Sequence, residues 1–427
     1  MGILIYELWS SIAEEEVNRI KTSRTVYGNS DKCLDFLTSV IEFHYINRNP
    51  QKEKQFPDRW NLAKSASILL TYLSQCTNPS IIDFVFKLIK DHINSENSKI
   101  KDSVLMAYGA IMETVHESKI KEIIEGSLPT LIKMLSDKSL DVRTTVSWVI
   151  KKICKYHCDR LQVIYVSNSA LFAEFVETLI KFLNSNKKVI VNICESFNYL
   201  ALGAKKNGNP GLYRTNFLSA YYEVLFNTLM TIAFLKDAIS PEFNIPLYAF
   251  YALSALIDNA PADVMSFIQT FFSNFIKYLS DTREKNKFES DEYRFLYQEY
   301  LCSVISSYLC DHKITLNLEQ AKYLYSEIRE IFIERNNVFD SGIMVCSSIA
   351  LNIGKSFVEI LPDYGNFLFH ALSQWNVESV CRNAVSSISD LIRSLGEDFD
   401  TYVDQLMPLV FSIIEVLLFI LFLYFFK

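Results

Sequence analysis

Glycine and proline are scarce in this sequence, with 11 and 10 among 427 residues. An all-β fold with many hairpins needs these residues at most of its corners, so their scarcity argues against such a fold. Half of the residues are hydrophobic and 21% are charged, and these proportions exclude a disordered or collagen-like chain. The composition favours a helical protein that buries a large apolar surface.

An excess of basic residues is also missing. The formal net charge is −7 and the isoelectric point is near 5.6, so nucleic acid is not the expected partner, because phosphate binding needs a basic surface. The nine cysteines are spread thinly and lack the dense, even spacing of a secreted disulfide scaffold. A reducing compartment is the expected location.

Catalytic signatures are absent as well. The sequence contains no glycine-rich phosphate loop, nucleophile elbow, zinc-protease helix or kinase signature, and it has six scattered histidines. Cys154, His157 and Cys158 could share one helical face, but a tetrahedral zinc site needs a fourth ligand and none is close in sequence. We expect ordinary thiols there, and no metal, cofactor or enzymatic activity.

Apolar residues recur with a helical period along most of the chain. Two stripes at 81–89 and 104–115 are followed by two more at 124–135 and 142–153, which predicts helical hairpins of about 40 residues. Further pairs are expected at 170–205, 213–260, 262–310, 316–356 and 357–396. Polar breaks at 48–59, 205–211 and 283–294 fit loops.

Such hairpins cannot bury their apolar faces alone, so they stack. The predicted fold is therefore all-α, an α-solenoid of roughly eight to ten HEAT-type hairpins wound into a superhelix. It is expected over residues 1–408, with the first hairpin incomplete. Pro129 within a first helix and the turn from Asp137 to Arg143 fit the HEAT type, and the Asp and Arg of this turn are expected to bridge adjacent repeats.

Residues 409–427 form an apolar C-terminal tail. Leu409 to Phe426 is about long enough to span a bilayer, and Glu415 is its only charged residue. Three interpretations stay open: a mispredicted terminus, a buried terminal helix and a membrane anchor.

Several phrases, dispersed but in order, carry a family resemblance. They are Glu7–Glu16, Arg59–Lys64, Ala107–Glu113, Leu128–Leu135, Asp141–Trp148 and Val191–Cys194. Together they resemble the central HEAT repeats of importin β (the karyopherin β family), from about residue 4 to about residue 412. The resemblance implies a fragment that lacks the family's N-terminal and C-terminal repeats.

The resemblance also implies a function. A chain of this family would be a nuclear transport receptor, without catalysis, that binds the basic importin-β-binding segment of an importin α-type adaptor, or a basic cargo peptide, on the concave face made by the second helices. Ran would release the ligand, and Phe-Gly nucleoporins would bind within about 262–396. Such a receptor is expected in cytoplasm and nucleus, at the nuclear pore and envelope.

The residues at the positions of the family's adaptor site define the expected binding surface. They are Glu14, Glu15, Glu16, Trp60, Asn61, Glu113, Trp148 and Glu195. Tryptophan faces stack on guanidinium groups, and carboxylates bind these groups through paired hydrogen bonds.

Three departures modify this expectation. Glu195 replaces a family tryptophan, and Lys155 stands where an acid is expected. The segment 51–59, before Trp60, is not acidic overall, so release by Ran through that loop is not expected. The alternative functions are a different HEAT-repeat scaffold for protein assembly and a tail-anchored membrane protein with a cytosolic solenoid.

Overall fold

The structure is a computed structural model of the 427-residue chain. It describes residues 11, 62–76, 80–115, 117–204, 214–235, 239–240, 243–288, 290–310, 313–374, 377–408 and 410–411. The chain divides into two compact units, residues 1–206 and residues 207–427.

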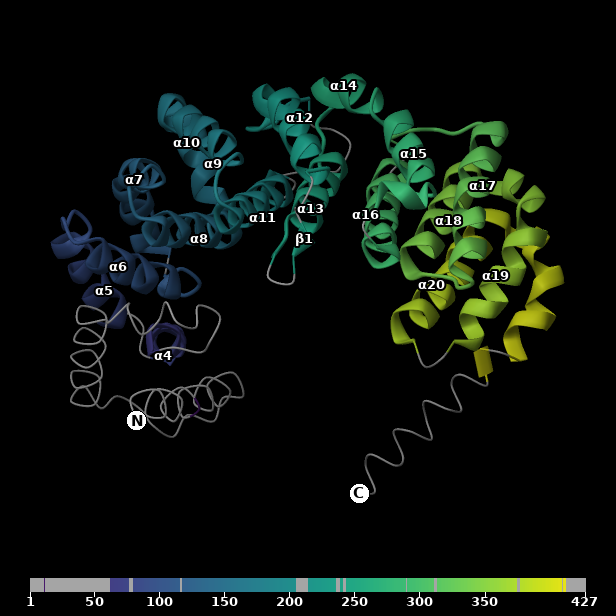
Figure 1. The fold of residues 1–427 in the computed structure, drawn as a ribbon, viewed down its shortest axis with the longest axis horizontal. Helices are drawn as coiled ribbons and strands as arrows, with labels where there is room; N and C mark the ends of the chain where they lie inside the picture. Colours follow the sequence, from purple (N-terminus) through teal and green to yellow (C-terminus); the bar gives the residue numbers. More distant parts are fainter. Residues whose placement is uncertain are drawn as a thin grey trace. The chain divides into compact units, whose positions relative to one another are not determined.

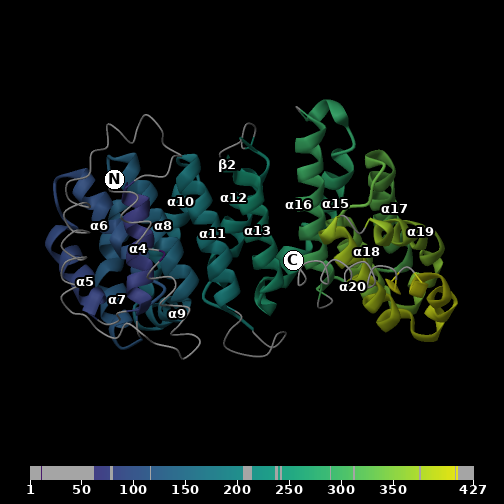
Figure 2. The ribbon, with the colours of Figure 1, turned by 90° about the horizontal axis from the view of Figure 1, so that it is seen from below.

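The described part of unit 1 is helical. Its helices are α4 (Leu62–Cys76), α5 (Ser80–His92), α6 (Ser98–Ile111), α7 (Glu117–Met134), α8 (Leu140–Tyr156), α9 (Cys158–Ser167), α10 (Ser169–Phe182) and α11 (Lys187–Ala204). Three hairpins follow one another: α5–α6, α7–α8 and α10–α11. The second helices α4, α6, α8 and α11 pack on each other in that order. Figure 1 shows the first helices α7 and α10 on one side of unit 1 and the second helices α8 and α11 on the other. Figure 2 shows α6, α8 and α11 in sequence.

Local sequence sets where these helices begin. The side-chain oxygen of Asn97 accepts a hydrogen bond from the Lys99 amide at the start of α6, and Asn168 accepts one from the Leu171 amide at the start of α10. These side chains satisfy backbone donors that lack a partner within the helix. The helix α7 continues through Pro129, as expected for a first helix of this repeat type.

The core of unit 1 is shared between hairpins. Its buried side chains include Leu69, Val104, Leu128, Val146, Ile150, Phe172 and Phe197. Because each hairpin buries its apolar stripe against its neighbours, the unit is stabilised by repeat-to-repeat packing.

The turn between α7 and α8 links two hairpins. The Asp137 carboxylate forms an ion pair with Lys101 of the preceding hairpin. Arg143 instead donates hydrogen bonds to the carbonyl oxygens of Asp137 and Lys138, at 2.7 and 3.2 Å. The Asp of this turn therefore bridges adjacent repeats as predicted, whereas these hydrogen bonds of Arg143 stay within its own hairpin.

Unit 2 contains shorter and less regular elements. In chain order these are η1 (Ser219–Tyr221), α12 (Tyr222–Ala233), β1 (Ile239–Ser240), β2 (Phe243–Asn244), α13 (Ile245–Asp258), η2 (Ala262–Val264), α14 (Met265–Gln269), α15 (Phe272–Asp281), η3 (Lys285–Lys287), α16 (Asp291–Leu309), α17 (Leu318–Arg335), α18 (Asp340–Ile353), η5 (Gly354–Glu359), α19 (Leu361–Ser373), α20 (Glu378–Leu395) and η6 (Gly396–Phe399). Residues 400–408 are also helical. The strands β1 and β2 pair antiparallel, with Ile239 opposite Asn244.

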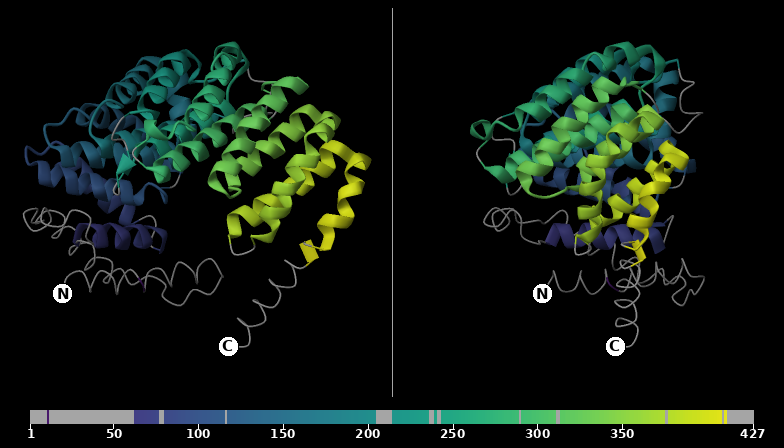
Figure 3. Two further views of the ribbon diagram at one scale, coloured as in Figure 1. Left: turned by 45° about the vertical axis from the view of Figure 1, so that its right-hand side comes forward. Right: turned by 90° about the vertical axis from the view of Figure 1, so that its right-hand side faces the viewer.

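Four hairpins make up unit 2: α12–α13, α15–α16, α17–α18 and α19–α20. Their second helices α13, α16, α18 and α20 pack in order, and Figure 3 shows the later hairpins as consecutive layers. The predicted α-solenoid is confirmed. The described residues contain seven hairpins and α4; the remainder of the predicted eight to ten, and the tail from residue 412, lie outside them.

One stretch of the described residues, Asp340–Glu359, is long and apolar enough to cross a membrane. It comprises α18 and η5, and 56% of its most apolar window is buried inside the protein. This burial is what a core helix of a solenoid requires.

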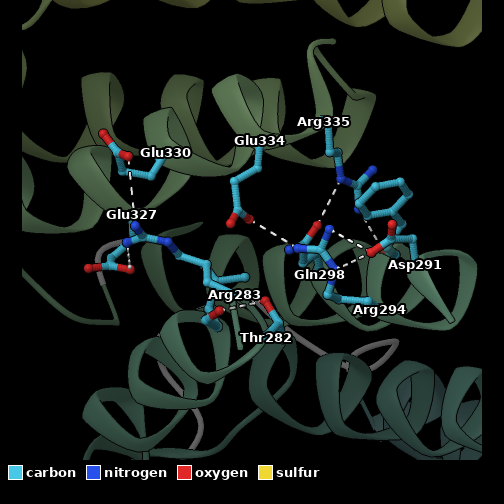
Figure 4. Close-up of polar contacts among 11 residues, drawn as sticks. Thr282, Arg283, Asp291, Arg294, Gln298, Glu327, Glu330, Glu334 and Arg335 are labelled. Carbon is cyan, nitrogen blue, oxygen red and sulfur yellow. Dashed lines mark hydrogen bonds and ion pairs between the residues drawn. The ribbon is translucent and has the colours of Figure 1, made fainter. Parts of the chain in front are cut away.

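Two arginines join the α15–α16 hairpin to the α17–α18 hairpin (Figure 4). The Arg294 side chain is 2% exposed, and it contacts Asp291 at 2.9 Å and Glu334 at 3.0 Å. Arg335 donates to Gln298 Oε1 at 2.8 Å and to the Phe295 carbonyl at 2.6 Å.

The Arg335 guanidinium is also stacked between aromatic rings. Its Cζ lies 4.4 Å from the centre of the Phe295 ring and 4.0 Å from that of Phe339, and its Nη1 lies 3.1 Å from Glu299. Planar stacking together with several hydrogen bonds is a combination that arginine can make and lysine cannot.

Candidate functional site

The candidate site is the solvent-facing side of α8, together with the turn after α6 and the neighbouring part of α11. We call it the α8 face and define it by Glu113, Trp148, Lys151, Lys152, Lys155, Tyr156, Glu195 and Tyr199. Contacts along α8 bring together three of the predicted residues, Glu113, Trp148 and Glu195. The other five, Glu14, Glu15, Glu16, Trp60 and Asn61, lie outside the described residues.

Trp148 is seated on the backbone of α6. A Cβ atom on Gly109 would lie 2.0 Å from Cζ3 of Trp148, so the indole ring fits closely only because residue 109 has no side chain. The tryptophan is half-buried, so part of its surface faces solvent. It serves both as a packing residue and as a surface on which a ligand could stack.

Lys152 lies one helical turn after Trp148 and covers it. Its Nζ is 5.6 Å from the Trp148 ring centre and 5.3 Å from the Tyr156 ring centre, both within the range of a cation–π contact. Burial lowers the pKa of Lys152, and this effect outweighs the nearby Glu113 carboxylate, which would raise it. This lysine therefore holds its charge in a partly dehydrated site.

Tyr156 connects Lys155 to the end of α6. Its hydroxyl donates a hydrogen bond of 2.9 Å to Glu113, and the Lys155 Nζ lies 4.8 Å from its ring centre and 5.8 Å from that of Tyr199. Burial is the main cause of the raised pKa of Tyr156. Its hydroxyl therefore stays protonated, and remains a donor, at neutral pH.

Glu195 already has a cationic partner. The Lys151 Nζ lies 2.9 Å from Glu195 Oε2, and the two side chains are 19% and 23% exposed. The predicted role of Glu195 was to bind an arginine of a ligand. A ligand would have to share or replace Lys151 at this carboxylate.

The α8 face is not acidic. It holds three lysines (151, 152 and 155) and two glutamates (113 and 195), which leaves one net positive charge (3 − 2). Its aromatic rings are covered by lysines from the same helix. The electrostatics around the three predicted residues that the structure describes therefore differ from those of an open acidic surface.

The cysteines and histidine at the end of α8 are packing residues. Cys154 is fully buried, and burial raises the pKa of its thiol. His157 Nε2 lies 2.6 Å from the Met112 carbonyl, and Cys158 packs against Gly203 of α11. No cluster of metal-ligating side chains occurs among the described residues.

A cavity of about 570 Å³ lies between the first helices α5 and α7. Its wall includes Phe86 and Ile89 of α5, Ile123 of α7 and Tyr108 of α6, and the Lys119–Asp83 ion pair joins α7 to α5 beside it. It involves none of the predicted site residues.

Sequence reasoning missed Gly109, Lys151, Lys152, Tyr156 and Tyr199. One signal was present: Trp148, Lys152 and Tyr156 follow one another at intervals of four, so they share one helical face. The contact between Gly109 and Trp148 had no such signal, because the two residues come from different hairpins.

The chain is similar to proteins of known family. A family model described as importin subunit beta-1-like, TPR repeats, matches residues 174–417, and a HEAT-like repeat model matches residues 98–153. Importin subunit beta-1 of Schizosaccharomyces pombe is 21% identical over 94% of this chain and 47% of that protein. The Saccharomyces cerevisiae protein of that name is 24% identical over 96% of this chain and 47% of that protein. The chain thus spans about half the length of these relatives.

Solved structures share the fold. The Kap95:Nup1 complex is similar with a TM-score of 0.79 at 21% identity, covering 96% of this chain and 47% of that one. A structure of Kap95p with RanGDP gives a TM-score of 0.75 at 22% identity, covering 97% of this chain and 48% of that one. At these identities the likeness concerns the fold.

Proposed function

The chain belongs to the importin subunit beta-1-like family, and from this premise we propose that it is a nuclear transport receptor that binds a basic segment of an importin α-type adaptor, or a basic cargo peptide, on the surface of its second helices. The observation that carries the proposal is the position of Trp148, half-buried on α8, with Glu113 in the turn after α6 and Glu195 on α11. An indole and two carboxylates are the groups that bind arginine side chains.

The remaining predicted site residues extend the proposal toward the N-terminus. Glu14, Glu15, Glu16, Trp60 and Asn61 would supply further acids and a second tryptophan before α4. Repeats that stack in order present their second helices side by side, so a long extended segment can contact several of them.

Two further partners are proposed on the strength of relatives. Kap95 has been solved in complexes with Nup1 and with RanGDP, so we propose that this chain binds Phe-Gly nucleoporins, within 262–396, and that Ran regulates release. The corresponding location is cytoplasm and nucleus, at the nuclear pore and envelope.

The test is a titration of a fluorescently labelled, basic importin-β-binding segment of importin α against the full 427-residue chain, at 50 and 200 mM salt. We expect saturable binding that weakens at the higher salt, because exposed charges are screened more strongly there. Trp148→Ala and Trp60→Ala should each weaken binding at least tenfold, as removal of a central aromatic contact commonly does.

Tyr165→Ala provides a matched control, because Tyr165 is a 40% exposed aromatic residue on α9 outside the α8 face. It should leave affinity unchanged, and circular dichroism should show that all variants are folded. Absence of binding by the folded chain would contradict the adaptor proposal. That result would favour a HEAT-repeat scaffold whose partner has another chemistry, an outcome that the net positive charge of the α8 face makes worth testing.

A further inference from the structure

We propose that Lys152 is a specificity-determining residue of the α8 face: its ammonium occupies the aromatic site that an arginine of a bound basic segment would use, so a ligand must displace it. The inference deepens the proposed function and rests on it, since it concerns a cationic ligand at Trp148.

The Lys152 ammonium lies where a cation of a ligand would lie. One ammonium contacts two rings, Trp148 four residues before it and Tyr156 four residues after it, at 5.6 and 5.3 Å. A guanidinium that stacks on the indole within about 6 Å would need the space in which this ammonium lies. The internal cation and a ligand cation therefore compete for one place.

The other two lysines of the α8 face have partners of their own. Lys151 is engaged by Glu195 at 2.9 Å, and Lys155 lies over Tyr156 and Tyr199. None of the ion pairs recorded for the described residues of unit 1 includes Lys152. Its ammonium is held by the faces of the Trp148 and Tyr156 rings and by electrostatic attraction to Glu113. The same two rings and the same carboxylate would attract a cation of a ligand.

Displacement of Lys152 from the rings has a limited cost. Lys152 is half-buried, and its neighbours Lys151 and Lys155 repel it. On leaving the rings its ammonium regains water, which offsets part of the lost cation–π attraction. Lys152 therefore weakens the binding of basic segments, and it weakens most the binding of segments that carry few cations.

The first experiment examines the free protein. Lysines of the full chain are dimethylated with ¹³C-formaldehyde, which keeps their charge, and observed by NMR. The methyl signal that disappears in Lys152→Gln should lie upfield of the other lysine methyl signals because of the ring currents of Trp148 and Tyr156. A Lys152 methyl signal at the chemical shift of exposed lysines would overturn the proposal, whatever the result of the binding experiment.

The second experiment measures competition. Lys152→Gln removes the charge, and it should bind the labelled basic segment roughly fivefold more tightly than the wild type, the factor expected for one cation–π contact of middling strength. Lys181→Gln is the matched control, because Lys181 also lies over an aromatic ring, that of Phe182 at 6.0 Å, but on the first helix α10. In a Trp148→Ala background the gain from Lys152→Gln should shrink toward zero.

The outcomes separate the two proposals. If the wild type binds and Lys152→Gln binds equally, the inference fails and the proposed function stands. If only Lys152→Gln binds, the inference stands and adaptor binding by the natural chain fails. If neither binds while both are folded, both fail.

Discussion

Trp148 rests on Gly109, and this contact sets the position of the α8 face. We expect Gly109→Ala to force the indole away from α6, because the new Cβ would lie 2.0 Å from Cζ3. Overpacking of this kind costs about 1–3 kcal/mol of unfolding free energy. Urea unfolding followed by circular dichroism measures the loss, and the peptide titration measures the effect on binding.

Gly126→Ala is the control for this substitution. Gly126 lies inside α7, and its Cβ would meet nothing within 4 Å. Alanine should therefore stabilise the helix by roughly 0.5–1 kcal/mol. Equal effects of the two substitutions would show that the Trp148 contact does not constrain residue 109.

Asp137 gives a pH dependence with a defined sign. Burial alone would raise its pKa, but the hydrogen bonds from Lys101 and the Ser139 amide and the nearby Arg143 outweigh burial and lower it. A carboxyl group whose folded pKa is lowered stabilises the fold above its unfolded pKa, and this contribution disappears as the pH falls through the folded pKa.

We therefore expect Asp137→Asn to destabilise the chain at pH 7 and to lose this effect on acidification below the ordinary carboxyl pKa of about 4. Unfolding free energies of the wild type and the variant at pH 7, 5 and 3 test it. If the difference in unfolding free energy between the wild type and Asp137→Asn grows toward pH 3, the lowered pKa of Asp137 is contradicted.

Trp148 and Glu195 are half-buried on α8 and α11, and Glu113 is exposed in the turn after α6. From its apolar spacing, the sequence predicted which side of each second helix is buried. It did not reveal that Lys151 pairs with Glu195 or that Lys152 covers Trp148. Those contacts depend on side-chain conformations and on a neighbouring helix about 40 residues away.

At the scale of elements, the arginine junction between α16 and α17 is a buried polar connection. Arg335→Met should cost about 1–3 kcal/mol, because it leaves the buried Gln298 Oε1 without its donor, whereas the freed Glu299 side chain is 36% exposed and is hydrated. Arg393→Met is the control: Arg393 is 71% exposed and lies 3.5 Å from Asp390, so its loss should cost less than about 1 kcal/mol. Denaturant unfolding of both variants tests the difference, and similar costs would argue against a structural role of the junction.

The sequence predicted the hairpins whose apolar stripes extend over several helical turns. It did not predict the short elements that connect them. The pairs at 124–135 and 142–153 correspond to α7 and α8, because a stripe of several turns identifies a helix reliably. The short helix α9 and the strands β1 and β2 were not predicted. A ten-residue helix and two-residue strands carry too few periods, and their pairing depends on adjacent hairpins.

At the scale of the whole molecule, we expect a destabilising substitution in one unit to lower mainly the stability of that unit. In repeat proteins stability is approximately a sum of repeat and nearest-neighbour terms. Phe197→Ala in unit 1 and Phe226→Ala in unit 2 each remove a fully buried ring, at a cost of about 3–5 kcal/mol.

Hydrogen exchange with peptide-level mass spectrometry should show each variant losing protection mainly in its own unit. Uniform loss of protection along the chain in both variants would indicate a single cooperative transition instead. The division between residues 206 and 207 falls inside the polar segment 205–211, which the sequence marked as a break between helices.

The close fit of Trp148 on Gly109 has an evolutionary consequence. Two residues from different hairpins share one contact, so neither position can vary freely while the other is kept. Across related sequences the two positions should covary: a small side chain at the position of Trp148 should accompany alanine or serine at the position of Gly109, whereas tryptophan should be paired with glycine.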